Sequence, residues 1–118
     1  MRVNENDLIS AFDVDGTLIT VVNENTYPDD LLSITDPYTG TVKIRVAYMP
    51  NIELMKKHKA QGYYIKVWSH GGAQWAKTVI ETLKLTNIVD EIESKPIKYT
   101  DDLHASEWMG SPIFVKED

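Results

Sequence analysis

The chain has 118 residues and no cysteine, 42% of its residues are hydrophobic and 25% charged, and its formal net charge is −6. This length predicts one compact domain, and the composition excludes a disordered chain, a disulfide framework and a thiolate metal site. No apolar run reaches membrane-spanning length and no signal-peptide pattern opens the sequence, so we expect a soluble, cytoplasmic protein that binds no membrane, while the negative charge argues against broad electrostatic binding of nucleic acid.

The first predicted element is a buried strand over residues 8–12, which ends directly before Asp13. Residues 18–48 are less regular. Within them Asp36-Pro37-Tyr38-Thr39-Gly40 has the composition of a turn, and it separates two strand-like runs at residues 31–35 and 41–46. The pattern predicts a β-hairpin arm, with a long surface loop as the alternative.

A helix is predicted between Pro50 and Gly62, because proline favours the first turn of a helix and glycine follows its end. Its spacing places Ile52 and Met55 inward and turns three lysines toward water, Lys56, Lys57 and Lys59. A strand over residues 63–68 follows, rich in β-branched and aromatic side chains.

The second predicted helix spans residues 73–83 and has an apolar stripe made of Ala76, Val79, Ile80 and Leu83. Two more strands are predicted at residues 97–100 and 113–115, and the apolar run at 88–92 is a weaker candidate. Strands that alternate with helices indicate an α/β fold with a mostly parallel sheet.

Chemistry-bearing residues follow the predicted strands, and open α/β sheets bind ligands at the carboxyl ends of their strands. Asp13 and Asp15, two positions apart and followed by Gly16 and Thr17, indicate phosphate chemistry. Ser69 follows the second strand, and Lys95 precedes an acidic pair, Asp101 and Asp102.

In this order the motifs resemble the haloacid dehalogenase (HAD) superfamily of phosphohydrolases, over about residues 8–103. The segments that carry the resemblance are Asp13-Val14-Asp15-Gly16-Thr17, Trp68-Ser69-His70-Gly71-Gly72 with Trp75-Ala76, Lys95-Pro96, and Tyr99-Thr100-Asp101-Asp102-Leu103. They are most similar to small capless members, some of them found in phages. The resemblance implies a Rossmann-like three-layer sandwich with a trimmed, mostly parallel sheet, in which the hairpin arm forms a flap.

By this resemblance, Asp13 is the nucleophile that forms an aspartyl-phosphate, and Asp15 is the general acid and base. A Mg²⁺ ion would be bound by Asp13, Asp15 and the Val14 carbonyl together with Asp101 and Asp102, because clustered carboxylates repel one another without a cation. Which residue of the late pair is the direct ligand stays open.

Ser69 would donate a hydrogen bond to the phosphoryl group, although a serine before a helix is also a common N-cap. Lys95 would neutralise phosphoryl charge. If residues 97–100 form an extended strand, Lys95 begins too far below the site, and Lys98 or Arg45 would replace it. The remaining expected substrate contacts are Gly16, Thr17, His70, Gly71 and Arg45, while Trp68 and Trp75 are expected in the core.

No segment is long enough for a folded cap domain, so the site would be open to a large substrate such as a phosphorylated polymer end or protein, or to a small phosphoester. A nucleotide or a phosphorylated nucleic-acid end fits this description, and Tyr27, Tyr38 and Tyr48 are further candidate contacts. Two alternatives remain: a receiver-like phosphoacceptor module, and a catalytically inactive relative that binds a partner. The sequence leaves the oligomeric state open.

Overall fold

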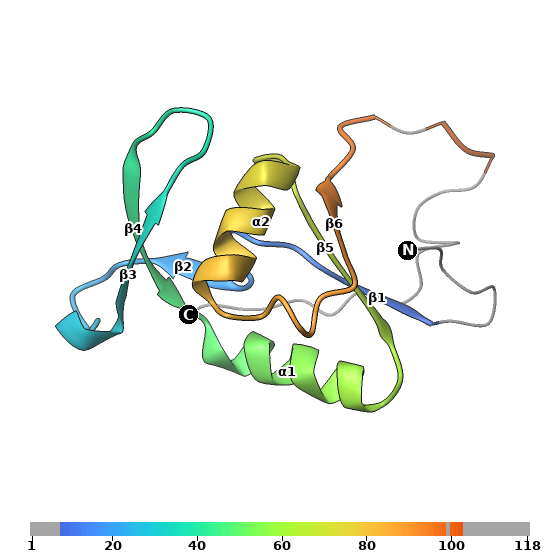
Figure 1. Ribbon diagram of the computed structural model, residues 1–118, viewed down its shortest axis with the longest axis horizontal. Coiled ribbons are helices and arrows are strands. Elements are labelled where there is room, and N and C mark those ends of the chain that lie inside the picture. The colour runs from blue at the N-terminus through green and yellow to red at the C-terminus, as the bar shows by residue number, and fades with distance from the viewer. Residues whose placement is uncertain (1–7, 99, 103–118) are drawn as a thin grey trace.

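A computed structural model describes residues 8–98 and 100–102, and these form an α/β fold (Figure 1). The elements in chain order are β1 (Ile9–Phe12), β2 (Ile19–Val21), the 3₁₀ helix η1 (Pro28–Asp30), β3 (Leu31–Thr35), β4 (Val42–Ala47), α1 (Met49–Ala60), β5 (Tyr64–Ser69), α2 (Ala73–Thr82) and β6 (Glu91–Ser94). The two predicted helices, the first strand and the strand between the helices are confirmed within one or two residues at each end. The expected burial of the first strand is wrong, because Ile9 is exposed and only Phe12 of β1 is buried.

The described strands form two separate three-stranded sheets. Strands β1, β5 and β6 form a parallel sheet in that order, with Phe12 beside Val67 and Ser69 beside Ser94. Strands β2, β4 and β3 form a separate antiparallel sheet. The parallel sheet confirms the expectation drawn from the alternation of strands and helices.

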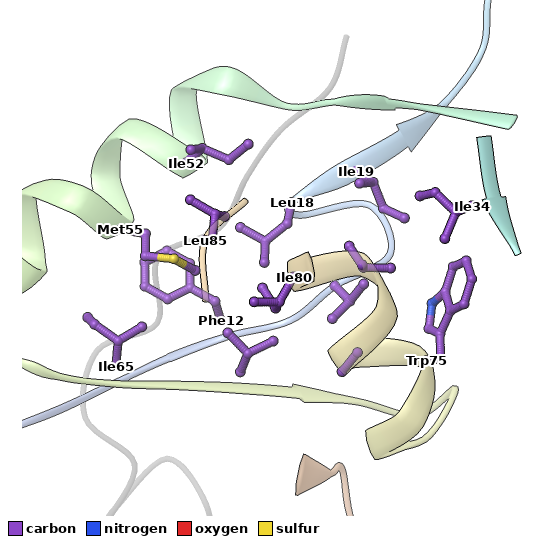
Figure 2. Close-up of a cluster of buried hydrophobic side chains, with 14 residues drawn as sticks. Phe12, Leu18, Ile19, Ile34, Ile52, Met55, Ile65, Trp75, Ile80 and Leu85 are labelled. Carbon is purple, nitrogen blue, oxygen red and sulfur yellow. The ribbon is translucent and has the colours of Figure 1, made fainter. Parts of the chain in front are cut away.

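The hydrophobic core lies between the parallel sheet, both helices and the antiparallel sheet (Figure 2). Ile65 and Val67 of β5 are fully buried among side chains of α1 and α2, whereas Lys66 and Trp68, on the other face of the strand, are half-buried. Both helices therefore cover the same face. The described residues form two layers here, which differs from the three-layer sandwich that the family resemblance implies.

The hairpin arm is confirmed and the alternative of a surface loop is wrong. Its strands β3 and β4 pair from Leu31 with Val46 to Thr35 with Val42. Sequence reasoning missed β2, a short strand that pairs with the other edge of β4 and is defined by a contact distant in sequence. Ile19 and Ile34 carry the inner face of this sheet into the core, as Figure 2 shows.

The last described strand does not lie where the sequence predicted it. Strand β6 spans Glu91–Ser94, close to the weaker candidate run, and residues 97, 98 and 100 lie outside any strand. Strand β6 contains two glutamates, Glu91 and Glu93. They pair across the sheet, since Lys66 contacts Glu93 at 2.8 Å and the Tyr64 hydroxyl bonds Glu91 at 3.0 Å. Tyr99 and the predicted strand at residues 113–115 lie outside the described residues.

One partly buried ion pair connects α1 to Asp90, the residue directly before β6. Lys59, expected to face water, is half-buried and its ammonium contacts the Asp90 carboxylate at 2.8 Å. The same carboxylate accepts the amide N–H of Ile65 at 2.7 Å. Burial by itself raises the pKa of Asp90, but the bonds from Lys59 and Ile65 outweigh it and hold the pKa below its ordinary value of 3.8.

Neither α1 nor α2, the helices of the described part of the chain, is long and apolar enough to cross a membrane.

We expect Asp90→Asn to lower the free energy of unfolding at pH 7 by about 1–2 kcal/mol, because it leaves Lys59 without its anion. The folded-state pKa is depressed, so this stabilisation is complete above pH 3.8 and is lost as the pH falls through the lower folded-state value. Urea unfolding at several pH values should therefore show the gap between wild type and variant closing in acid. Glu53→Gln, which removes the exposed partner of Lys56, is the control and should cost about 0.5 kcal/mol or less.

Candidate functional site

Three of the predicted site residues lie at one edge of the parallel sheet. The strands run in the same direction, so their carboxyl ends meet there: Asp13 follows β1, Ser69 ends β5 and Lys95 follows β6. The backbone N–H of Lys95 donates to the Ser69 carbonyl at 2.9 Å, which extends the β5–β6 pairing by one step. Lys95 therefore lies at the sheet edge, and the concern that it begins below the site was wrong because the strand precedes it.

The turn after β1 has a tightly bonded backbone. Gly16 has a φ of +78°, and its N–H donates to the Ile19 carbonyl at 2.8 Å. The Val14 carbonyl accepts the N–H groups of Thr17 at 3.1 Å and Leu18 at 2.9 Å. Because these amides occupy it, we leave the Val14 carbonyl out of the proposed metal ligands.

The Val14 side chain is fully buried in the core, whereas Asp13 is half-buried and Asp15 is exposed. Thr17 is attached to the start of α1, since its carbonyl accepts the Asn51 side-chain amide at 2.8 Å. The turn is therefore anchored by its buried apolar side chain, and its two carboxylates lie outside the hydrophobic core.

The Asp15 carboxylate is bonded to α2. The indole Nε1–H of Trp75, in the first turn of α2, donates to Asp15 Oδ2 at 3.1 Å. Trp75 is buried with 4% exposure, as the sequence predicted, but its polar atom faces the site rather than the core. Sequence reasoning missed this contact, and no local pattern around either residue signals it.

The loop after β5 bonds within itself. Ser69 is 1% exposed, its Oγ accepts the Gly71 N–H at 2.9 Å, and its carbonyl accepts the Gly72 N–H at 3.1 Å.

Ser69 is not the N-cap of α2, because that position belongs to Gly72. The first helical N–H, of Ala73, donates instead to Ser94 Oγ from β6 at 2.9 Å. The loop thus has Ser69 buried beneath it and exposed His70 at its tip.

The tip of the arm reaches this loop. The Tyr38 hydroxyl accepts the Gln74 N–H at 3.3 Å and lies where a side chain on Gly72 would project, at a residue whose φ of +103° already favours glycine. The Tyr38 N–H donates to Asp36 at 2.8 Å, and this bond together with Lys43 holds the pKa of Asp36 below its ordinary value. Lys43 pairs with Asp36 at 3.2 Å.

The other expected contacts are dispersed. Arg45 lies within β4, where it pairs with Val21 and Leu32, and its guanidinium donates to the Ile44 carbonyl at 2.8 Å. Tyr27 and Tyr48 lie directly before η1 and α1 respectively, and the Tyr48 N–H donates to the Leu18 carbonyl at 2.9 Å. Lys95 places its ammonium 5.8 Å from the centre of the ring of Trp68, a residue on the face of β5 opposite the helices.

The late acidic pair does not join the early one. After β6 the chain, orange in Figure 1, leads away from the end of β1, and Asp101 and Asp102 are exposed. Among the residues that the structure describes, no three His, Asp or Glu side chains form a group that could hold a metal ion. The physical reason is that β6 ends at Ser94, so the acidic pair does not follow a strand of the sheet as predicted.

Comparison with known proteins adds no relative. No protein-family model matches the chain. No curated protein and no solved structure matches it either. The functional interpretation therefore depends on the motifs and on the geometry of this sheet edge.

We expect Gly71→Ala to lower the free energy of unfolding by about 1–3 kcal/mol, because overpacking forces buried groups to move. A Cβ at this position would lie 2.9 Å from Trp75 Cδ1 and 3.2 Å from Ser69 Oγ. Urea unfolding followed by tryptophan fluorescence measures the effect. The neighbouring substitution His70→Ala, at an exposed loop position, should change stability by about 0.5 kcal/mol or less, and equal costs for the two variants would contradict this packing.

Proposed function

We propose that the protein is a phosphomonoester hydrolase that works through an aspartyl-phosphate intermediate on Asp13. The observation that supports it best is the arrangement at the sheet edge, where Asp13, Ser69 and Lys95 follow three adjacent parallel strands in the order that the motifs require. Such an edge is where open α/β sheets bind ligands. A carboxylate is ionised at neutral pH, so Asp13 needs no separate base to act as a nucleophile.

The proposed reaction has two steps. A carboxylate oxygen of Asp13 attacks phosphorus, the bond from phosphorus to the ester oxygen breaks, and Asp15 gives its proton to that departing oxygen. Water then attacks the aspartyl-phosphate and gives a proton to Asp15, the bond from phosphorus to Asp13 breaks, and inorganic phosphate leaves. Both carboxyl groups return to their starting states, so the cycle balances without an oxidant or reductant.

The neighbouring residues would bind the phosphoryl oxygens. Ser69 Oγ accepts one hydrogen bond, from Gly71, and this leaves its own proton to donate. Lys95 supplies positive charge at the end of β6, one position beyond the residue paired with Ser69. Charge-assisted donors directed at the phosphoryl group stabilise the negative charge that its oxygens carry in the transition state.

Mg²⁺ fits this site with fewer protein ligands than the sequence predicted. The ion is usually bound through one or two carboxylates plus substrate phosphate oxygens and waters rather than by a complete protein cage. Asp13 supplies one carboxylate at this turn, and we infer that it and the substrate phosphate hold the ion, without Asp101 and Asp102, while Asp15 is kept for proton transfer. When bound, the ion would offset the negative charge shared by phosphate and carboxylates.

We expect Asp13→Asn to reduce hydrolysis of phosphate monoesters by a factor of about 10⁴ or more, because the amide cannot form the intermediate. The measurement is phosphate release from a panel of nucleotides, 3′- and 5′-phosphorylated oligonucleotides, phosphopeptides and small esters, with Mg²⁺ or with EDTA. Asp29→Asn, an exposed aspartate of η1, is the matched control and should retain wild-type rates. Full activity in Asp13→Asn would refute the proposal.

The same panel separates the alternatives. Wild-type protein that forms a phospho-aspartate stable for many minutes, with no release of phosphate, would indicate a receiver-like phosphoacceptor. Protein that neither forms the adduct nor releases phosphate would indicate an inactive, partner-binding relative.

Lys95 and Lys98 are distinguished by their positions. Lys95 is half-buried and bonded through its backbone to Ser69, whereas Lys98 is exposed and lies outside the strands. We expect Lys95→Met to lower kcat/KM by about 10²-fold, as the loss of one charge-stabilising group does, and Lys98→Met to change it less than about threefold. Steady-state kinetics of the two variants, with folding checked by circular dichroism, measures this. The opposite ranking would assign the role to Lys98.

A further inference from the structure

The contact between Trp75 and Asp15 joins two residues that are 60 positions apart in the chain. Asp15 is exposed on a turn, and an exposed carboxylate without a fixed partner samples several rotamers. The indole N–H is donor-only, so it can only bind a carboxylate oxygen that keeps a lone pair free. The indole bond goes to Oδ2 of Asp15, so Oδ1 is the oxygen that this donor leaves free.

The donor itself is held on several sides. Trp75 lies at the end of the core near Ile34 of the arm, as Figure 2 shows, and is 4% exposed. Gly71 packs so closely against the indole that a Cβ there would lie 2.9 Å from Cδ1. The ammonium of Lys43, from β4, lies 5.2 Å from the centre of the Trp75 ring. A buried ring with these neighbours keeps one orientation.

We propose that Trp75 is a positioning residue for Asp15, which fixes Oδ2 so that Oδ1 can exchange a proton with the leaving oxygen and later with water. This inference rests on the proposed phosphatase function. It also gives the arm a role beyond a flap. Lys43 of the arm, which pairs with Asp36, contacts the Trp75 indole that bonds Asp15. Trp75 touches Asp15 rather than the substrate, so it acts through that carboxyl group.

The first test compares leaving groups in Trp75→Phe, which keeps an aromatic ring and removes the N–H. Departure of an alkoxide needs a proton from Asp15, whereas p-nitrophenolate leaves without one. We expect kcat/KM, which reports the steps up to departure of the leaving group, to fall by about 10- to 100-fold for an alkyl phosphate and by less than about threefold for p-nitrophenyl phosphate. A purely structural role would lower both rates by the same factor, and that result would overturn the inference.

A second comparison shows whether Trp75 acts through Asp15. Trp75→Phe added to Asp15→Asn should cause no further loss of kcat/KM for the alkyl phosphate, because the group that the indole positions is already gone. Equal losses in both backgrounds would contradict the coupling.

The contact is tested without any activity through the indole ¹⁵N–¹H signal of Trp75, identified as the one absent from Trp75→Phe. Asp15→Ala should shift this signal and speed its hydrogen exchange, whereas Asp29→Ala should do neither. An unchanged signal in Asp15→Ala would refute the positioning contact. A shifted signal in a protein that hydrolyses no ester would refute the proposed function and the catalytic part of this inference while the contact stands, so the two failures differ.

Discussion

Burial of the Val14 side chain between two carboxylates is the constraint on which the candidate site depends. Val14 is fully buried, and the turn that follows it is closed by amides bonded to its own carbonyl. A residue anchored in the core leaves the flanking Asp13 and Asp15 at the surface of the sheet edge, because burying either charge without a partner would cost several kcal/mol. The same turn leads into Leu18 and Ile19, which lie in the core at the start of β2.

The arm and the sheet edge are parts of one packing arrangement. The inner face of the antiparallel sheet contributes Ile34 to the core, and the turn at its tip brings Tyr38 to the loop between β5 and α2. A flap tethered at its base and at its tip differs from a free hairpin, since both contacts restrict its motion. In this structure the arm contacts Trp75 through Lys43, whereas the sequence had indicated only a flap.

The correct parts of the sequence analysis came from local signals. Turn residues at 36–40 marked the arm, and apolar spacing placed Met55, Val79 and Ile80 in the core. The errors came from the region after α2, where the sequence placed the strand too late. In strand β6, Lys66 of the neighbouring β5 pairs with Glu93, and the Tyr64 hydroxyl donates a hydrogen bond to Glu91. That misassignment also misplaced Lys95 relative to the site and gave Asp101 and Asp102 a strand to follow.

The sequence by itself determined the first strand, the hairpin, the two helices and the strand between them, together with the apolar faces of the helices. It also identified Asp13, Asp15 and Ser69 as residues that follow or end strands, because each of these features depends on neighbours a few positions away. Only the tertiary structure decided which strand precedes Lys95, that both helices cover one face of the sheet, and that Trp75 bonds Asp15. These features depend on pairing between segments tens of residues apart, whose register is set by packing rather than by local propensity.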